Sequence, residues 1–207
     1  MCFRKRIMTT LLSSTFFGPV QWYQKLACSP KVLIEQHDAY QKQTFRNRCL
    51  IATTNGVQAL TVPVTVEQDR ALISDHGNWR HQHWQALTSA YGDSPFFQYY
   101  EDDLRPFFTE RWEYLYDYNE SIRQKMCELI DIHPNLSFTT EYVKSGDIEN
   151  DILDLREAIQ PKHPLADSQF TPQRYYQVYD RKHGFLANLS ILDLLCNMGP
   201  ESIFLLQ

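Results

Sequence analysis

Residues 11–35 read LLSSTFFGPVQWYQKLACSPKVLIE, and this stretch decides the fold class. Apolar residues 11–17 predict a short buried strand, and Pro19 after them suits the first position of a helix. Residues 20–27 then place apolar side chains at helical spacing, and residues 32–35 predict a second strand. Strand, helix and strand in one short stretch are typical of a βαβ unit, so we expect parallel strands and an α/β (or α+β) fold.

The next segment predicts a β-hairpin. Asn55-Gly56 lies between the β-prone runs 49–52 and 58–66, and both turn residues tolerate positive φ. Residues 72–74 predict a further short strand. We therefore expect a small central sheet with a hairpin beside it.

The half of the chain after Trp79 is mainly helical. Apolar side chains recur there at helical spacing, and Ser94-Pro95 has the residue types that cap and open a helix. The predicted elements are a helix over 96–108 that Pro106 ends or kinks, a helix over 115–132, a strand over 137–143, a mobile polar loop over 144–173, an extended segment over 175–179, and a helix over 188–198 that Asn188 caps.

We predict a single domain over residues 11–207, preceded by a disordered basic tail over 1–10. Met8 is an alternative start. A signal peptide is the other interpretation of the N-terminus, but its apolar part is short and lacks a small-residue cleavage site. No run approaches the ~18 apolar residues of a membrane span. Five widely separated cysteines predict free thiols and a cytoplasmic protein.

Composition and glycine spacing exclude several function classes. Lys and Arg number 20 against 25 Asp and Glu, a net charge of −5, which argues against a nucleic-acid partner. No two glycines lie closer than 15 positions apart, so neither GxGxxG nor a P-loop is present. GxSxG, HExxH and CxxC are absent too. The sequence identifies no cofactor and no oligomeric state.

The first candidate site is residues 41–48, QKQTFRNR. In an extended segment Arg46 and Arg48 face the same way, and two guanidinium groups suit a phosphate or carboxylate. The alternative is a solvated basic loop whose arginines pair with Glu35 or Asp38.

The second candidate is residues 75–84, DHGNWRHQHW. Three histidines and an aspartate resemble metal ligands, but His81 and His83 face opposite sides of a helix, so we predict no metal site. His83, next to Trp84, is the best-placed general base. The alternative is an ordinary surface helix start.

The third candidate is the corner between the first strand and the first helix. Gln21 and Tyr23 are placed there to hydrogen-bond a ligand, because ligands of open α/β sheets bind beyond the carboxyl ends of strands. The alternative is a packed corner of the core.

The fourth candidate is Asp193, a carboxylate among apolar residues. Burying it is costly unless it is paired. It either pairs with Arg46 or Arg48, points into a site, or belongs to a structural network.

Several short segments, which include parts of the candidate sites, occur along the chain in a recognisable order. The set comprises FGPVQWY at 17–23, a segment over 40–48 ending in Phe-Arg-Asn-Arg, LTVPV at 60–64, Trp79, His83, Tyr91, Ser94-Pro95, Phe96-Phe97, Tyr176-Gln177, and the closing helix with Leu-Ser-Ile-Leu-Asp at 189–193. Over residues 11–205 it resembles the WbqC-like protein family. The resemblance implies a bacterial protein encoded with genes for O-antigen and other surface polysaccharides, with an aminoacyl (glycine) transferase role.

One departure from that family limits what carries over. In members of that family, the segment after the first strand usually has Gln-Pro before its first aromatic residue. This chain has Ser14-Thr15-Phe16 at that place. Gln21 is not the positional equivalent of that Gln, so a role of the family's Gln is not assigned here.

These observations favour a transferase that modifies a sugar or sugar nucleotide by acyl or aminoacyl transfer. His83 is the predicted base, and the substrate is a small molecule bearing phosphate or carboxylate. The predicted substrate-binding residues are Gln21, Tyr23, Lys42, Arg46, Asn47, Arg48 and Asp193. For an enzyme, we expect Lys42, Arg46, Asn47 and His83 to converge on one deep pocket.

The alternative is a non-catalytic scaffold that uses aromatic helices over 79–112 as an interface. A nucleotidyl transferase is a third interpretation, but the HxGH motif of that class is missing.

Overall fold

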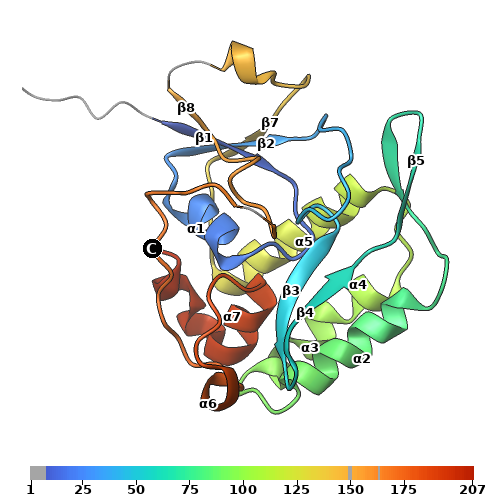
Figure 1. Cartoon of the computed structure of the whole chain (residues 1–207), viewed down its shortest axis with the longest axis vertical. Coiled ribbons are helices and arrows are strands. Elements are labelled where there is room, and N and C mark those ends of the chain that lie inside the picture. The colour runs from blue at the N-terminus through green and yellow to red at the C-terminus, as the bar shows by residue number, and fades with distance from the viewer. Residues whose placement is uncertain (1–7, 149–150, 163) are drawn as a thin grey trace, which may run out of the picture.

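A four-stranded parallel sheet forms the frame of the molecule, with strand order β7-β2-β1-β8. The computed structural model describes residues 8–148, 151–162 and 164–207. The strands are β1 (Thr9–Ser13), β2 (Lys31–Glu35), β7 (Leu136–Phe138) and β8 (Ile152–Asp154). Figure 1 shows the sheet at the top, with most helices below it. The chain is a mixed α/β domain, as predicted.

The opening stretch folds as the predicted βαβ unit. Helix α1 (Val20–Cys28) connects β1 to β2, and β1 and β2 pair in parallel, with Leu11 opposite Leu33. Pro19 precedes the first helical residue, where the absence of its N–H costs nothing. The first strand ends at Ser13 rather than at residue 17, because the Phe16 amide donates to the Phe45 carbonyl instead of to the sheet.

The N-terminal boundary differs from the prediction. Residues 1–7 of the predicted tail lie outside the described residues. Thr9 and Thr10, which the prediction also placed in that tail, belong to β1 and pair with Lys31 and Val32.

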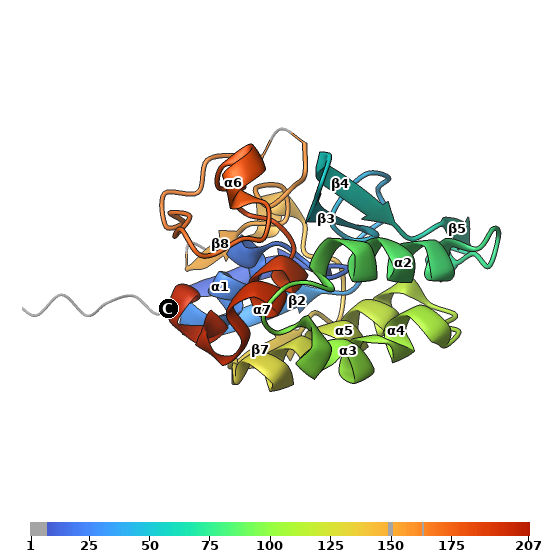
Figure 2. The ribbon, with the colours of Figure 1, turned by 90° about the horizontal axis from the view of Figure 1, so that it is seen from below.

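Two hairpins follow β2 where the sequence predicted one hairpin and a separate strand. Strands β3 (Arg48–Thr53) and β4 (Gly56–Thr61) pair antiparallel around the predicted turn, and Gly56 has a φ of 101°. The predicted run 58–66 is divided, since Val64–Glu67 forms β5 and pairs with β6 (Arg70–Ile73). Gln68 and Asp69 turn that second hairpin with φ values of 47° and 61°. The β5 end projects away from the sheet in Figures 1 and 2.

The helices that the periodicity predicted are present, with shifted ends, as α2 (Trp79–Tyr91), α3 (Phe97–Leu104), α4 (Pro106–Thr109), α5 (Leu115–Ile130) and α7 (Ile191–Met198). The sequence did not predict the short helix α6 (Asp180–His183) or the 3-10 turns η1 (Ser145–Asp147) and η2 (Gly199–Leu205). Pro106 divides α3 from α4, as expected from its missing N–H.

The cap of α7 is Ser190 and not Asn188. Ser190 Oγ accepts from the Leu192 amide at 3.3 Å, whereas Asn188 has a φ of 54° and bonds to Gln21. The helix therefore begins at Ile191, later than predicted.

The segment between α5 and α6 contains the largest differences from the prediction. The expected strand over 137–143 is only β7, and the expected polar loop over 144–173 contains η1 and β8. Residues 175–179 form no strand. Strand β8 pairs with β1, from the start of the chain, and nothing in its local sequence shows that partner.

The core is rich in aromatic side chains. The Phe17 and Phe108 rings stack with 5.6 Å between centroids, and Trp79, Phe97 and Phe107 are buried. The aromatic residues over 79–112, the interface of the scaffold alternative, therefore mostly face inward; Tyr99, 68% exposed, is an exception. Within the described residues, no helix combines the length and apolar character needed to cross a membrane.

Candidate functional site

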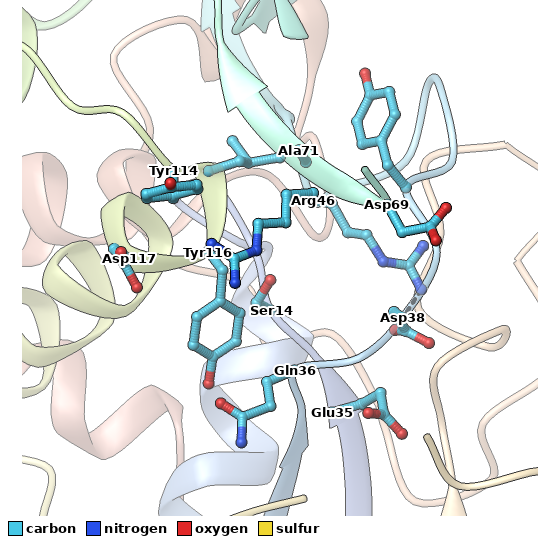
Figure 3. A pocket seen from close by; sticks show the side chains of 13 residues that line it. Ser14, Glu35, Gln36, Asp38, Arg46, Asp69, Ala71, Tyr114, Tyr116 and Asp117 are labelled. Atoms are coloured by element: carbon cyan, nitrogen blue, oxygen red, sulfur yellow. Dashed lines mark hydrogen bonds and ion pairs between the residues drawn. The ribbon is translucent and has the colours of Figure 1, made fainter. Parts of the chain in front are cut away.

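A cavity of about 410 Å³ opens where β1 and β2 end, and we call it the strand-end cavity. Ser14 follows β1 and Gln36 follows β2, so both lie at the carboxyl ends of parallel strands, where open α/β sheets bind ligands. Its lining includes Ser14, Gln36, Asp38, Arg46, Arg70, Tyr114 and Tyr116. Figure 3 shows the labelled lining groups arriving from the strand ends and the loop after β2, from the second hairpin and from the start of α5.

Arg46 is held at this cavity through its backbone. The Asn119 side-chain amide donates to the Arg46 carbonyl at 2.8 Å, and the neighbouring Phe45 carbonyl accepts from the Phe16 amide at 2.8 Å. These bonds fix the loop beside the end of β1. The Arg46 side chain thereby reaches the carboxyl end of the sheet.

The Arg46 guanidinium is already engaged. Its Nη2 lies 2.5 Å from Asp38 Oδ2 and 2.9 Å from Ser13 Oγ, and Figure 3 shows the ion pair with Asp38. The Arg46 and Asp38 side chains are 8% and 11% exposed. Arg46 Nε has no hydrogen-bond partner among the described residues. Asp38 is one of the two partners that the solvated-loop alternative named for Arg46, but the pair is nearly buried and not solvated. Arg46 Nε remains as a donor without a partner in the ranges described.

Arg70 is a cation at the cavity that the sequence argument missed. The Ile73 amide donates to the Glu113 carbonyl at 2.8 Å and Leu72 forms a β-bridge with Tyr114, so the second hairpin is attached to the start of α5. The Arg70 guanidinium carbon therefore lies 5.6 Å from the centroid of the Tyr114 ring. No carboxylate of the described residues lies within ion-pair distance of Arg70.

Two tyrosines of the cavity, Tyr40 and Tyr116, carry hydroxyl groups with a raised pKa. Burial raises the pKa of Tyr116, and Glu120 raises it further; burial also raises the pKa of Tyr40. Tyr116 Oη has no hydrogen-bond partner in the part of the chain described. It is therefore available as a donor or acceptor.

A buried charge network lies beside the cavity. Arg156 Nη1 is 3.2 Å from Glu35 Oε2 and 3.8 Å from Asp38 Oδ1, and Arg156 Nη2 is 2.8 Å from Asp154 Oδ2. Glu35 also accepts from Thr139 Oγ1 at 2.7 Å. These residues follow or end β2, β7 and β8, so the network ties the carboxyl ends of three strands together.

The rest of the predicted basic segment does not line the strand-end cavity. Arg48 donates from Nε to Thr61 Oγ1 at 3.0 Å, Asn47 is buried and donates to the Val62 carbonyl at 2.8 Å, and Lys42 is exposed. Residues 45–47 form a turn and not an extended strand. The alternation that aligned Arg46 with Arg48 therefore does not apply.

His83 lies in a buried aromatic setting on α2. Its ring centroid is 5.2 Å from that of Trp79 and 6.2 Å from that of Phe16. Burial lowers the pKa of His83 to about 4, so the ring is neutral at neutral pH. His83 is not among the residues lining the strand-end cavity, and its role as a base stays a prediction.

Gln21 and Tyr23 also lie away from the cavity lining. Gln21 donates to Asp167 Oδ2 at 3.0 Å and accepts from Asn188 Nδ2 at 3.0 Å, and Lys25 forms a buried ion pair with the same aspartate at 2.7 Å. Tyr23 is fully buried, which raises the pKa of its hydroxyl.

Asp193 belongs to a buried polar network. Its carboxylate accepts from Tyr91 Oη at 2.9 Å, Tyr175 Oη at 2.6 Å and Gln177 Nε2 at 2.8 Å. Burial raises the pKa of this carboxyl. No contact joins it to Arg46 or Arg48 among the described residues.

The structure thus brings Arg46 to the cavity and leaves Lys42, Asn47 and His83 elsewhere, so these four do not converge on it. Across the three described ranges, no group of three or more His, Cys, Asp or Glu side chains is arranged to hold a metal ion. Cys28, Cys49, Cys127 and Cys196 are free thiols, and Cys2 lies outside the described residues.

The comparisons with known proteins include the residues that line the strand-end cavity. The WbqC-like protein family matches residues 14–169, which include the lining of the strand-end cavity and its charge network. The chain belongs to the WbqC-like protein family. This WbqC-like chain is also 26% identical over 209 residues to the uncharacterised protein Rv1507c of Mycobacterium tuberculosis, an alignment that covers 87% of this chain and 89% of the relative. No solved structure matches it. Asp193 lies beyond the matched residues.

Proposed function

We propose that this WbqC-like protein is a cytoplasmic transferase that binds a phosphorylated sugar or sugar nucleotide in the strand-end cavity and transfers an acyl or aminoacyl group to it. The observation that carries the proposal is Arg70. Its guanidinium lies over the Tyr114 ring, in a cavity of about 410 Å³, with no carboxylate partner among the described residues. A guanidinium without an ion pair is suited to bind phosphate by two parallel hydrogen bonds.

The other groups of the cavity suit a sugar. Asp69 and Asp117 are exposed carboxylates at the cavity and are suited to accept from sugar hydroxyls. Tyr116 Oη and Arg46 Nε lack partners in the described structure and are suited to donate to ligand oxygens. Buried polar groups normally have partners, so these two groups favour a bound ligand in the functional state.

The transfer step follows from these assignments. An amine or hydroxyl of the sugar forms a bond to the carbonyl carbon of an activated acyl ester, and the bond from that carbon to its leaving group breaks. The leaving group keeps the electron pair, and the proton of the attacking group passes to a base and then to the leaving group. Asp117 is a carboxylate at the cavity for that task, whereas His83 is the base predicted from the sequence.

Isothermal titration calorimetry with glucose 1-phosphate and UDP-glucose tests the binding site. Arg70→Ala is expected to weaken binding of both by at least about tenfold, because a charge-assisted bond of about 1.5–3 kcal/mol is lost. Arg181→Ala removes an exposed arginine outside the cavity and serves as the matched control. Equal affinity in wild type and Arg70→Ala contradicts the assignment.

Mass spectrometry tests the transfer itself. A UDP-amino sugar incubated with the protein and an acyl thioester or aminoacyl ester is expected to gain the mass of the acyl group. Binding without any mass change favours the scaffold alternative. Loss of turnover with retained binding in Asp117→Asn, but not in His83→Gln, assigns the base to Asp117, and the reverse assigns it to His83.

A further inference from the structure

A second cavity shares one wall residue with the strand-end cavity. It measures about 320 Å³, and its lining includes His37, Asp38, Tyr142, Asp154, Arg156 and Glu157. We call it the Tyr142 cavity. Asp38 lines both cavities, so molecules bound in the two are adjacent at this carboxylate.

The chemistry of the Tyr142 cavity suits a cation. Its lining carries three carboxylates and one guanidinium. Asp154 pairs with Arg156 and Asp38 pairs with Arg46, whereas Glu157 is exposed and forms no ion pair with any described residue. Tyr142 is 47% exposed, and its ring already lies 5.2 Å from the Arg156 guanidinium carbon. Aromatic faces beside carboxylates are favourable surroundings for an ammonium group.

The two oxygens of Asp38 are used differently. Oδ2 accepts from Ser13 Oγ and from Arg46 Nη2, both at 2.5 Å. Oδ1 accepts no hydrogen bond from any described residue, and its ion-pair contact is Arg156 Nη1 at 3.8 Å. Because a carboxylate oxygen accepts up to two hydrogen bonds, Oδ1 retains capacity for a ligand, while Oδ2 fixes the group in place.

We propose that the Tyr142 cavity is a second ligand site for a small primary amine, whose ammonium group contacts Asp38 Oδ1, so that the ligands of the two cavities meet at this carboxylate. The inference rests on the proposed function in that a transferase must hold two substrates side by side. It assigns the aminoacyl donor, through its amino group, to the Tyr142 cavity, and it assigns the phosphorylated sugar, which carries the attacking group, to the strand-end cavity.

Nuclear magnetic resonance titration of the full chain with glycinamide tests the site. Acetamide, which has the same amide but no ammonium group, is the matched control probe. Glycinamide is expected to shift the backbone amides of His37, Tyr142 and Glu157 saturably, and acetamide is not. Glu157→Gln is expected to weaken glycinamide at least fivefold, while Glu201→Gln, an exposed change outside this cavity, leaves it unchanged. Shifts elsewhere, or equal affinity in Glu157→Gln, overturn the proposal.

Variants that separate the cavities distinguish this inference from the proposed function. Asp38→Asn and Glu157→Gln are each expected to weaken glycinamide, because the ammonium group loses a charged partner, whereas Arg70→Ala is expected to weaken glucose 1-phosphate alone. A folded Asp38→Asn that binds glycinamide as wild type does overturns the shared contact. Failure of glucose 1-phosphate to bind, with glycinamide bound as expected, overturns the proposed function and retains the amine site.

Discussion

Arg46 and Asp38 form a nearly buried ion pair at the end of β1, with 2.5 Å between Arg46 Nη2 and Asp38 Oδ2. Ser13 Oγ bonds to both side chains. The pair therefore holds the loop that carries Arg46 against the sheet, in addition to lining the strand-end cavity.

Arg46→Ala is expected to lower the free energy of unfolding by about 3 kcal/mol, because Asp38 is left without its closest cation. Urea denaturation measures this change. In the double variant Arg46→Ala with Asp38→Asn, the loss of unfolding free energy is expected to be smaller than the sum of the two single losses. The reason is that Asp38→Asn removes the carboxylate charge that Arg46→Ala leaves unpaired. If Arg46→Ala lowers the free energy of unfolding by less than about 0.5 kcal/mol, the ion pair does not stabilise the fold as we expect.

The buried His83 ring predicts a loss of stability in mild acid. Burial lowers the pKa of His83 from 6.5 to about 4, so between these values the unfolded chain binds a proton that the folded chain does not. Stability is full above pH 6.5 and falls as the pH drops toward 4, by about 3 kcal/mol from this group alone. Urea unfolding between pH 7.5 and 4.5 measures it. His83→Leu is expected to lose this part of the pH dependence, and an unchanged dependence contradicts the prediction.

The Asp193 network is expected to act on stability and not on ligand binding. Asp193→Ala leaves the hydroxyls of Tyr91 and Tyr175 and the amide of Gln177 without their acceptor and is expected to cost about 3 kcal/mol. Asp193→Asn, which keeps one carbonyl oxygen, costs less. Both losses are read from thermal and urea unfolding. A folded Asp193→Asn that no longer binds glucose 1-phosphate would instead place Asp193 in the binding site.

Gly199 is expected to tolerate no side chain. Its φ is 55°, and a Cβ there would lie 2.4 Å from the Phe96 ring. Gly199→Ala is therefore expected to cost about 2 kcal/mol or more, from backbone strain and overpacking together. Gly146, which has nothing within 4 Å of an added Cβ, provides the matched control, and Gly146→Ala is expected to stay within about 1 kcal/mol. Similar costs for the two variants contradict the argument.

The elements that could be predicted from the sequence are determined by residues that lie within them or directly beside them. Pro19 opens α1, Asn55-Gly56 turns the first hairpin, and Pro106 divides two helices. Strand β8 is different, because its three residues lie in a polar segment and their partner β1 is at the other end of the chain. A short strand whose stability comes only from a distant partner has no local signal.

In the candidate site too, features that depend on residues distant in the sequence could not be predicted. Arg46 lines the strand-end cavity, and its paired state follows from Asp38, which the sequence argument named as a partner. Arg70 was not singled out, because its position depends on the bridge between Leu72 and Tyr114. That contact joins a hairpin to a helix start far along the chain, and neither segment indicates the other.

All four strands of the sheet run in one direction, so the chain leaves each of them on the same side of the molecule. The connections that follow can lengthen or shorten there while the side on which the strands begin stays unaltered. Proteins built on this frame can therefore diverge in the molecules they recognise without any change of architecture.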